Sequence, residues 1–294
     1  MFKGAIVAVV TPFKDGGVDE TKLTELVEFQ IKNGTAGIVP CGTTGESPTL
    51  STAEHERVIE ICIKAAKKRV PVIAGTGSNS TEEAVSLTKN AANAGANAAL
   101  VVSPYYNRPT QKGLYLHFKA IAESVDIPII LYNIAGRTAV NIEPATIAQL
   151  AKDCKNIIGV KEASGSLEQM STIKRLCPGD FLLFSGDDAL TLPVLSIGGV
   201  GVISVVSNIA PHAVVHLIDL FNKGEMKKAQ ALHYKLLALI KAIFIETNPI
   251  PIKTAMGLLG MCSADLRLPL CAMNEENLTK LKKALKDFGL LKGK

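Results

Sequence analysis

The sequence predicts an α/β protein, a (β/α)8 TIM barrel with a C-terminal helical subdomain. Short apolar runs alternate with amphipathic stretches eight times within about 220 residues. The runs are continuous rather than alternating, which is typical of strands buried on both faces of a parallel sheet. A chain of 294 residues is long enough for one large domain of this kind. A doubly wound open sheet is the alternative topology.

The eight predicted strands lie at regular intervals, and each is followed by a helical pattern. They cover residues 5–10, 37–40, 71–74, 98–103, 127–132, 157–161, 181–185 and 201–205. In the first unit, apolar residues recur at helical spacing and a glycine stands where a C-terminal cap belongs: Leu23, Leu26, Val27, Ile31 and then Gly34. Three later helices begin with capping-box spacing: Ser51 with Glu54, Ser80 with Glu83, and Ser166 with Gln169.

The last part of the chain departs from the repeat. We therefore predict a catalytic barrel over residues 1–223 and a helical subdomain over residues 224–294. The final helix has apolar positions at Leu278, Leu281, Leu285 and Phe288, with Gly289 as its stop. Lysines 280, 282, 283 and 286 lie on its other side, which we interpret as a solvated face.

Charge and hydropathy argue against several classes of protein. The net charge of +5 is spread along the chain without interleaved aromatic residues, so we expect no nucleic-acid partner. Residues 189–218 carry no charged side chain, but proline, glycine and asparagine interrupt them. We expect a helix, a buried strand and a loop there, and no membrane segment. The N-terminal apolar run is too short for a signal peptide.

Cysteine and histidine spacing does not predict a metal site. The six cysteines are scattered without a Cys-x-x-Cys pair, which favours reduced thiols in a cytoplasmic protein. His212 and His216 are four residues apart, but no third ligand accompanies them, so we expect no metal.

The segment 156–165 (Asn-Ile-Ile-Gly-Val-Lys-Glu-Ala-Ser-Gly) delivers one lysine, Lys161, at the end of a buried strand. Desolvation disfavours an ammonium ion, and a neutral amine is a nucleophile that forms a Schiff base with a ketone. The alternative is a side chain that extends to water and keeps its charge there. The other strand ends decide between these interpretations, because function in this fold collects at the C-terminal face.

Six strand ends carry polar segments that such a face would bring together. They are 41–47 (Cys-Gly-Thr-Thr-Gly-Glu-Ser), 103–109 (Ser-Pro-Tyr-Tyr-Asn-Arg-Pro), 132–138 (Tyr-Asn-Ile-Ala-Gly-Arg-Thr), Lys161, 185–188 (Ser-Gly-Asp-Asp) and 201–205 (Gly-Val-Ile-Ser-Val). Individually they are a turn, a rim aromatic or a surface charge. Together they supply a nucleophilic amine, phenols for proton transfer, an anion cradle and a guanidinium.

These six motifs, in this order, resemble those of the dihydrodipicolinate synthase family of pyruvate-dependent lyases and aldolases. The resemblance extends from about residue 2 to about residue 291 and includes residues 248–253 (Asn-Pro-Ile-Pro-Ile-Lys). It implies a lyase that condenses pyruvate with L-aspartate 4-semialdehyde to 4-hydroxy-tetrahydrodipicolinate. This is the first committed step of diaminopimelate and lysine biosynthesis.

The resemblance also implies roles for catalytic residues. Lys161 would form an imine with pyruvate, Tyr132 would shuttle protons at that imine, and Thr43 and Tyr106 would connect Tyr132 to bulk water. No metal or organic cofactor is implied. In the family, the tyrosine that matches Tyr106 comes from a neighbouring subunit, which implies a homodimer as the smallest complete catalyst. The family's usual assembly is a homotetramer, a dimer of dimers.

The substrate-binding residues follow from the same resemblance. Thr44 matches the residue that holds the pyruvate carboxylate through its hydroxyl and amide. Arg137 matches the residue that receives the semialdehyde carboxylate, a role suited to the fork of donors on a guanidinium. Gly186 and Ile203 match positions whose backbone carbonyls line the site.

L-Lysine is a further expected partner, as a feedback inhibitor. Residues at the family's lysine-contacting positions are Ser47, His55, Asn79, Glu83 and Tyr105. Pro48 and Thr52 depart from the alanine and histidine that many inhibited members carry. Two expectations therefore stand: inhibition by L-lysine, or a pocket that these two substitutions have made insensitive.

Other functions remain as alternatives. A sugar-acid or 4-hydroxy-2-oxoglutarate aldolase would use the same Schiff base, but N-acetylneuraminate lyases lack an arginine at position 137 and usually carry Ser-Thr in place of Thr43 and Thr44. The loop 134–136 lacks the proline that family members often have, which predicts altered loop stiffness. A binding protein without catalysis would form no adduct. A phosphate-binding barrel is disfavoured because Asp187 and Asp188 would repel phosphate.

Overall fold

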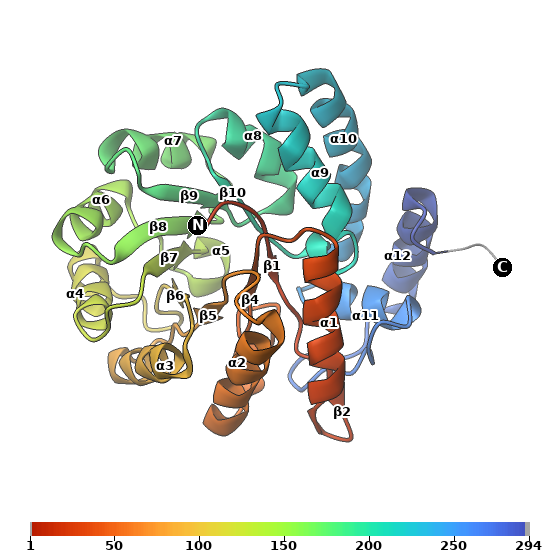
Figure 1. Cartoon of the computed structure of the whole chain (residues 1–294), viewed down its shortest axis with the longest axis horizontal. Coiled ribbons are helices and arrows are strands. Elements are labelled where there is room, and N and C mark those ends of the chain that lie inside the picture. Colours follow the sequence, from red (N-terminus) through yellow and green to blue (C-terminus); the bar gives the residue numbers. More distant parts are fainter. Residues whose placement is uncertain (1, 292–294) are drawn as a thin grey trace.

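The backbone forms a closed barrel of eight parallel strands surrounded by helices (Figure 1). The computed structural model describes residues 2–291. The barrel strands are β1 (Gly4–Ala8), β4 (Gly37–Val39), β5 (Ile73–Gly75), β6 (Ala98–Val102), β7 (Ile129–Asn133), β8 (Ile157–Glu162), β9 (Leu182–Ser185) and β10 (Gly201–Ser204). Their order is β4-β1-β10-β9-β8-β7-β6-β5, and a parallel bridge between Ile38 and Val72 joins the two end strands. The predicted barrel is confirmed, and the open-sheet alternative is wrong.

Helices follow the strands in the predicted alternation. They are α1 (Glu20–Lys32), α2 (Thr52–Ala66), α3 (Thr81–Ala94), α4 (Gln111–Ala122), α6 (Pro144–Asp153), α7 (Leu167–Leu176), α8 (Thr191–Ser196) and α9 (Pro211–Asn222). The predicted stripe of α1 buries Leu23, Leu26 and Val27, and Gly34 beyond its end has a φ of 83°. Only glycine adopts this left-handed conformation without strain, so it suits a helix end.

The capping prediction is right in part. At α2, Ser51 accepts a hydrogen bond from the Glu54 amide, and the Glu54 carboxylate returns to the Ser51 amide, a full capping box. Ser80 and Ser166 also cap α3 and α7 through the amides three residues on. Their partner side chains bond elsewhere, because Glu83 contacts Ser78, and Gln169 contacts Asn141 and Glu162. The full box predicted at these two helices is therefore wrong.

Several short elements were not predicted, among them a two-stranded hairpin and a single helical turn. A short antiparallel hairpin, β2 (Phe13–Lys14) with β3 (Gly17–Val18), follows β1. One turn of helix, α5 (Ala135–Thr138), lies in the loop after β7. Both are too short to give a periodic pattern.

Residues 189–218 resolve into α8, β10, a 3-10 turn η3 (Val206–Asn208) and the start of α9, as predicted. Among residues 2–291, no helix has both the length and the apolar composition needed to cross a membrane. All six cysteines are free thiols, as predicted, and Cys271 alone is exposed.

Alternate strand residues point into the barrel, where they form one apolar cluster. Its members include Ile6, Val39, Ile130, Tyr132, Phe184 and Ile203. Strand residues of the other parity pack against the surrounding helices. Side chains at the C-terminal end of the interior row therefore face the barrel mouth.

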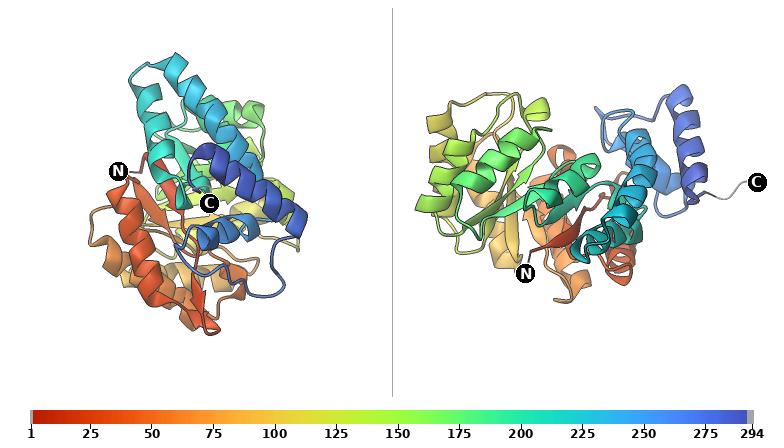
Figure 2. Two further views of the ribbon diagram at one scale, coloured as in Figure 1. Left: turned by 90° about the vertical axis from the view of Figure 1, so that its right-hand side faces the viewer. Right: turned by 90° about the horizontal axis from the view of Figure 1, so that it is seen from above.

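Three further helices follow the barrel: α10 (Met226–Ile243), α11 (Ile250–Leu258) and α12 (Glu275–Phe288). Figure 2 shows them on one side of the barrel, with α12 outermost. The predicted last helix is confirmed, since Leu281 and Leu285 are fully buried and Gly289 caps it with a φ of 91°. The apolar side chains of these helices belong to the same core cluster as α1, α2 and α9. Residues 292–294 of the predicted subdomain lie outside the described residues.

Candidate active site

Lys161 and Tyr132 lie side by side at the barrel mouth. They occupy paired positions on β8 and β7, so both side chains project from the same face of the sheet. Lys161 is 5% exposed, and its Nζ lies 4.1 Å from the centroid of the Tyr132 ring. The alternative of a lysine that extends to bulk water is therefore wrong. The geometry gives an enclosed amine beside a phenol, a pair suited to Schiff-base chemistry.

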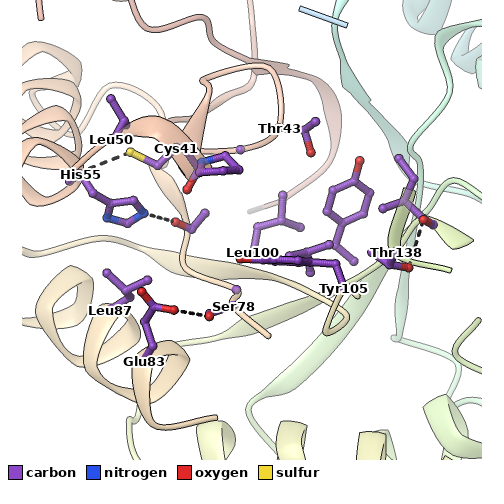
Figure 3. A pocket seen from close by; sticks show the side chains of 18 of the residues that line it. Cys41, Thr43, Leu50, His55, Ser78, Glu83, Leu87, Leu100, Tyr105 and Thr138 are labelled. Carbon is purple, nitrogen blue, oxygen red and sulfur yellow. Dashed lines mark hydrogen bonds between the residues drawn. The ribbon is translucent and has the colours of Figure 1, made fainter. Parts of the chain in front are cut away.

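A cavity of about 370 Å³ opens from this point toward α2 and α3. Seven predicted site residues line it: Thr43, Tyr132, Arg137, Ser47, His55, Glu83 and Tyr105. Figure 3 shows that Thr43 and Thr138 lie toward one end, and that His55, Ser78 and Glu83 lie toward the other. Lys161 is outside this lining and borders it through Tyr132. One continuous hollow thus joins Thr43, Tyr132 and Arg137 to four of the five predicted lysine-contacting residues.

The loop after β4 carries the two threonines. Its turn closes through the Gly42 carbonyl, which accepts from the amides of Gly45 and Ser47 at 3.0 and 3.4 Å. The Thr11 hydroxyl donates to the Gly45 carbonyl at 2.7 Å and holds the turn against the chain after β1. Thr43 faces the cavity, whereas Thr44 is 2% exposed. The loop is therefore held by its own backbone and by a neighbouring strand end.

Arg137 lies on α5, at the rim of the cavity. Its Nη2 donates to the backbone oxygen of Asn248 at 2.9 Å, and the side chain is otherwise exposed in the single chain. Thr138 next to it is buried, and its hydroxyl donates to backbone oxygens of its own loop. A guanidinium with free donors at a cavity rim is suited to binding a carboxylate.

Gly186 lies directly against the end of β8, the strand that carries Lys161. A Cβ built on it would lie 2.6 Å from Ala163 Cβ and 3.2 Å from Lys161 Cγ. The Gly186 amide donates to the Glu162 carbonyl at 2.7 Å. Only glycine permits this close approach.

Ile203 is fully buried in the barrel interior, on β10. Asp188 lies behind the end of this strand and accepts from the amides of Val205 and Val206 at 2.9 and 3.1 Å. Burial raises the pKa of Asp188. These bonds fix the strand end that presents the backbone of Ile203, a contribution of Asp188 that the sequence did not indicate.

Tyr106 does not join the other residues within one chain. Its side chain is 89% exposed and its φ is 74°, an uncommon backbone conformation for an aromatic residue. The preceding Tyr105 lines the cavity instead. Within its own chain, Tyr106 is thus exposed and lies outside the lining of the cavity.

The predicted lysine-contacting residues surround the other end of the cavity. His55 Nε2 contacts the Gly75 carbonyl at 2.9 Å, and burial lowers the pKa of His55. Glu83 bonds to Ser78, and Asn79 Nδ2 donates to the Tyr105 carbonyl at 3.2 Å. Asn79 is outside the lining, and Pro48 and Thr52 are within it. The two departures from the family pattern therefore face the cavity.

A buried polar network connects β7 and β8 on their outer side, which faces the helices. Asn133 and Glu162 directly follow Tyr132 and Lys161 and are paired in register, so they point toward the helices. Asn133 Nδ2 lies 2.9 and 3.2 Å from the two Glu162 carboxylate oxygens. Gln169 and the Ser164 amide also donate to this carboxylate. The sequence did not indicate this network, because Asn133 and Glu162 were assigned to the loops that follow the two strands.

The histidine pair considered as a metal site, His212 and His216, lies on α9. His212 and His216 stack on one helix face with ring centroids 6.0 Å apart. Within residues 2–291, no three His, Cys, Asp or Glu side chains gather closely enough to hold a metal ion.

The thiol of Cys41 lines the cavity and donates to the His55 carbonyl, and burial raises the pKa of Cys41 well above its usual value.

Known proteins of one family match this sequence over nearly its whole length. The model of the dihydrodipicolinate synthetase family matches residues 1–288. The 4-hydroxy-tetrahydrodipicolinate synthase of Endomicrobium trichonymphae is 66% identical over 292 residues, which covers 99% of this chain and 100% of that protein.

Solved structures agree with the sequence relatives. Dihydrodipicolinate synthase from Aquifex aeolicus superposes with a TM-score of 0.97 at 52% identity, covering 99% of this chain and 100% of that one. The structure of the Cyanidioschyzon merolae protein with lysine bound superposes with a TM-score of 0.96 at 43% identity, covering 99% of each chain.

Proposed function

The chain belongs to the dihydrodipicolinate synthetase family, and from this premise we propose that the mouth around Lys161 is its active site. The chain is a lyase that condenses pyruvate with L-aspartate 4-semialdehyde to 4-hydroxy-tetrahydrodipicolinate, the first step of lysine and diaminopimelate biosynthesis. The observation that carries the assignment of the site is the enclosed amine of Lys161 against the Tyr132 ring, at 4.1 Å.

The reaction begins with attack of the Lys161 amine on the pyruvate ketone. Loss of water gives an imine, and its protonated nitrogen draws electrons from the pyruvate methyl group. A proton then leaves that methyl group and an enamine forms, whose carbon adds to the aldehyde of the second substrate and regenerates the imine. The amino group of the semialdehyde then attacks the imine carbon, which closes the ring and releases the Lys161 amine. This sequence needs no metal and no organic cofactor.

Proton transfer at the imine falls to Tyr132, the phenol in contact with the Lys161 amine. Thr43 lines the same cavity and extends the path toward solvent. Tyr106 completes this relay from a neighbouring subunit, since its own chain leaves it exposed.

The two substrates bring one carboxylate each. Thr44 receives the pyruvate carboxylate through its hydroxyl and amide, and Arg137 at the rim receives that of the semialdehyde. Gly186 and Ile203 present backbone carbonyls around the imine. Because Arg137 lines the cavity, the semialdehyde is favoured over sugar acids as the second substrate.

The experiment that tests this function is turnover of pyruvate with L-aspartate 4-semialdehyde, read through a coupled reductase, with Lys161→Ala as the blank. We expect turnover in the wild-type chain and none in the blank, whose circular dichroism remains native. Wild-type protein that forms a pyruvate adduct without turnover would redirect the search to other aldehydes. Equal rates in wild type and blank would refute the role of Lys161.

The proposed assembly is a homotetramer built from two dimers, in which Tyr106 crosses between subunits. Its exposure and positive φ support this proposal. Tyr106→Phe and Lys161→Ala chains should each be nearly inactive as pure preparations. After mixing and subunit exchange, hybrid dimers contain one intact site, so activity should reappear. No recovery in verified hybrids would contradict a shared site.

L-Lysine is the proposed regulatory ligand, bound among Ser47, His55, Asn79, Glu83 and Tyr105. The related structure with lysine bound supports the proposal. Titration calorimetry with L-lysine should show saturable binding that Glu83→Gln weakens. Heat no larger than that of dilution would mean that Pro48 and Thr52 have removed the site.

We also place the enzyme in the cytoplasm, where its thiols stay reduced.

A further inference from the structure

Asn248 contacts both of the proposed carboxylate receptors. Its Nδ2 donates to Thr44 Oγ1 at 3.0 Å, and its backbone oxygen accepts from Arg137 Nη2 at 2.9 Å. Within the described residues, these are the only hydrogen bonds made by the side chains of Thr44 and Arg137. Asn248 is 5% exposed and lies just before α11, outside the eight-fold repeat.

The contact to Thr44 determines what its hydroxyl can do. A hydroxyl has one proton to donate and two lone pairs. Because the Asn248 amide occupies one lone pair, the proton of Thr44 remains to be donated to a substrate carboxylate. The Oδ1 atom of Asn248 is buried and has no partner among the described residues, so the bond to Thr44 is the side chain's one polar contact.

A fully buried ion pair holds the same segment against the same loop. Lys253 Nζ, on α11, bonds to Glu46 Oε1 at 2.6 Å, and both side chains are 0% exposed. The second carboxylate oxygen of Glu46 accepts from the Arg267 amide at 3.1 Å, and Lys253 Nζ lies 4.1 Å from the Phe13 ring centroid. Glu46 follows Thr44 by two residues and has a φ of 55°.

Such a pair is a poor source of stability but a specific constraint on position. Apolar side chains of similar volume are often as stabilising as a buried ion pair, whereas loss of one partner leaves a buried charge. Burial lowers the pKa of Lys253, and the adjacent Glu46 carboxylate opposes this effect. The pair therefore fixes where the loop lies relative to α11.

We infer that Asn248 is a positioning residue for Thr44, and that the Lys253–Glu46 pair holds the Thr44 loop in place for pyruvate. The C-terminal helices thus set the affinity of the barrel for its first substrate. The inference rests on the proposed function of Lys161 and Thr44.

The first test replaces Asn248 by leucine, which keeps the volume and the backbone oxygen that Arg137 needs. Borohydride trapping over a range of pyruvate concentrations measures half-saturation of the imine. We expect Asn248→Leu to raise this concentration about tenfold, the size of one lost hydrogen bond to a charged system. The KM for the semialdehyde should change less than about twofold. Thr254→Val is the matched control and should match wild type, because the Thr254 hydroxyl, on α11, donates to the Ile250 carbonyl of its own helix.

A double-variant cycle separates positioning from general damage. In a Thr44→Val background, Asn248→Leu should raise the half-saturation concentration no further, because its partner hydroxyl is gone. An undiminished effect in that background, or equal weakening of both substrates, would overturn the inference. A wild-type chain that forms no imine would instead refute the proposed function.

The second test concerns the ion pair. Lys253→Met alone should lower thermal stability strongly, and Glu46→Met with Lys253→Met should regain most of it. The stable double variant should still need several times more pyruvate than the wild-type chain for half-saturation of the imine. Wild-type half-saturation in that stable double variant would show that the pair serves stability alone and would overturn its positioning role.

Discussion

The surroundings of Lys161 hold its side chain in one place, which suits the nucleophilic role that we propose for it. Tyr132 covers one side of the amine, and Gly186 leaves room on the other. The position of Lys161 near the end of a buried strand was predictable from the apolar run before it, whereas the role of Tyr132 followed from the family resemblance. The role of Asn248 was not predictable, because it depends on contacts with residues more than one hundred positions earlier. Long-range side-chain contacts leave no periodic trace in a single sequence.

Gly186→Ala should abolish most activity without unfolding the chain. The added methyl would lie 2.6 Å from Ala163 Cβ and 3.2 Å from Lys161 Cγ, so Ala163 must shift and the stem of Lys161 must give way. A displacement of this kind typically costs about 100-fold in kcat. Gly179→Ala is the control, because a methyl there meets nothing within 4 Å. Steady-state kinetics that are the same for both variants would contradict the proposed packing of Gly186 against Lys161.

His117 should make stability depend on pH. Burial lowers the pKa of His117 to about 4, from an ordinary 6.5. Between these values the unfolded chain takes up a proton that the folded chain refuses. The stabilisation is therefore complete above pH 6.5 and is lost as the pH falls toward 4, by about 3 kcal/mol at most.

His117→Asn tests this dependence, because asparagine can keep the contact that His117 Nδ1 makes with Thr81 at 2.9 Å without titrating. Urea unfolding at pH 7 and pH 4 should show a smaller loss of unfolding free energy in the variant. His216→Asn, at an exposed position, is the control. The same loss in His117→Asn and wild type would contradict the assignment.

At the scale of elements, β7 and β8 present the proposed catalytic pair on one face and a buried polar network on the other. Tyr132 and Lys161 face the barrel, while Asn133 and Glu162 face the helices. Asn133 Oδ1 also accepts from the Ile142 amide at 3.0 Å. This bond holds the far end of the loop that carries Arg137.

Asn133→Leu should therefore lower both stability and affinity for the second substrate. The variant leaves the buried Glu162 carboxylate with fewer donors, at an expected cost of about 2–4 kcal/mol. The loop with Arg137 loses a tether, so the KM for the semialdehyde should rise more than that for pyruvate. Thermal unfolding and initial rates measure the two effects.

Asn156→Leu is the matched control for this variant. Asn156 donates to the carbonyls of Ala122 and Val125 at the opposite end of β8. Its loss should destabilise the chain with little change in either KM. An equal KM change in both variants would mean that Asn133 acts only through stability.

The strands and most helices could be predicted because each has its own apolar pattern and start signal. All eight strands were found, with differences of one or two residues at their ends. The hairpin β2–β3 and the turn α5 were missed, since two to four residues carry no period. The reciprocal capping bonds failed at α3 and α7 because tertiary partners compete for Glu83 and Gln169.

At the scale of the whole molecule, the barrel and the C-terminal helices share one core. Leu236, Leu239, Ile240 and Ile243 of α10 are at most 4% exposed and belong to the cluster that contains β1 and α2. Arg267 also bonds to Glu54, and this contact lowers the pKa of Glu54 to about 2. The boundary at residue 223 remains a prediction about topology.

Residues 1–223 expressed alone should not fold. The four buried apolar side chains of α10 each contribute about 1.5–3 kcal/mol to folding. A fragment that ends before α10 therefore loses about 6–12 kcal/mol of stabilisation. This is comparable to the whole stability of a typical domain, about 5–15 kcal/mol. Circular dichroism and size-exclusion chromatography of the fragment are the measurement. A monodisperse fragment with a cooperative melt would show that the barrel is an independent domain.

Peptide mass spectrometry after borohydride reduction tests most directly whether Lys161 forms the covalent bond to pyruvate. We expect one reduced pyruvate adduct per chain, on the peptide that contains Lys161, and none without pyruvate. Adding L-aspartate 4-semialdehyde before the reduction should consume the adduct. No adduct, or an adduct on another lysine that persists in Lys161→Ala, would contradict the account.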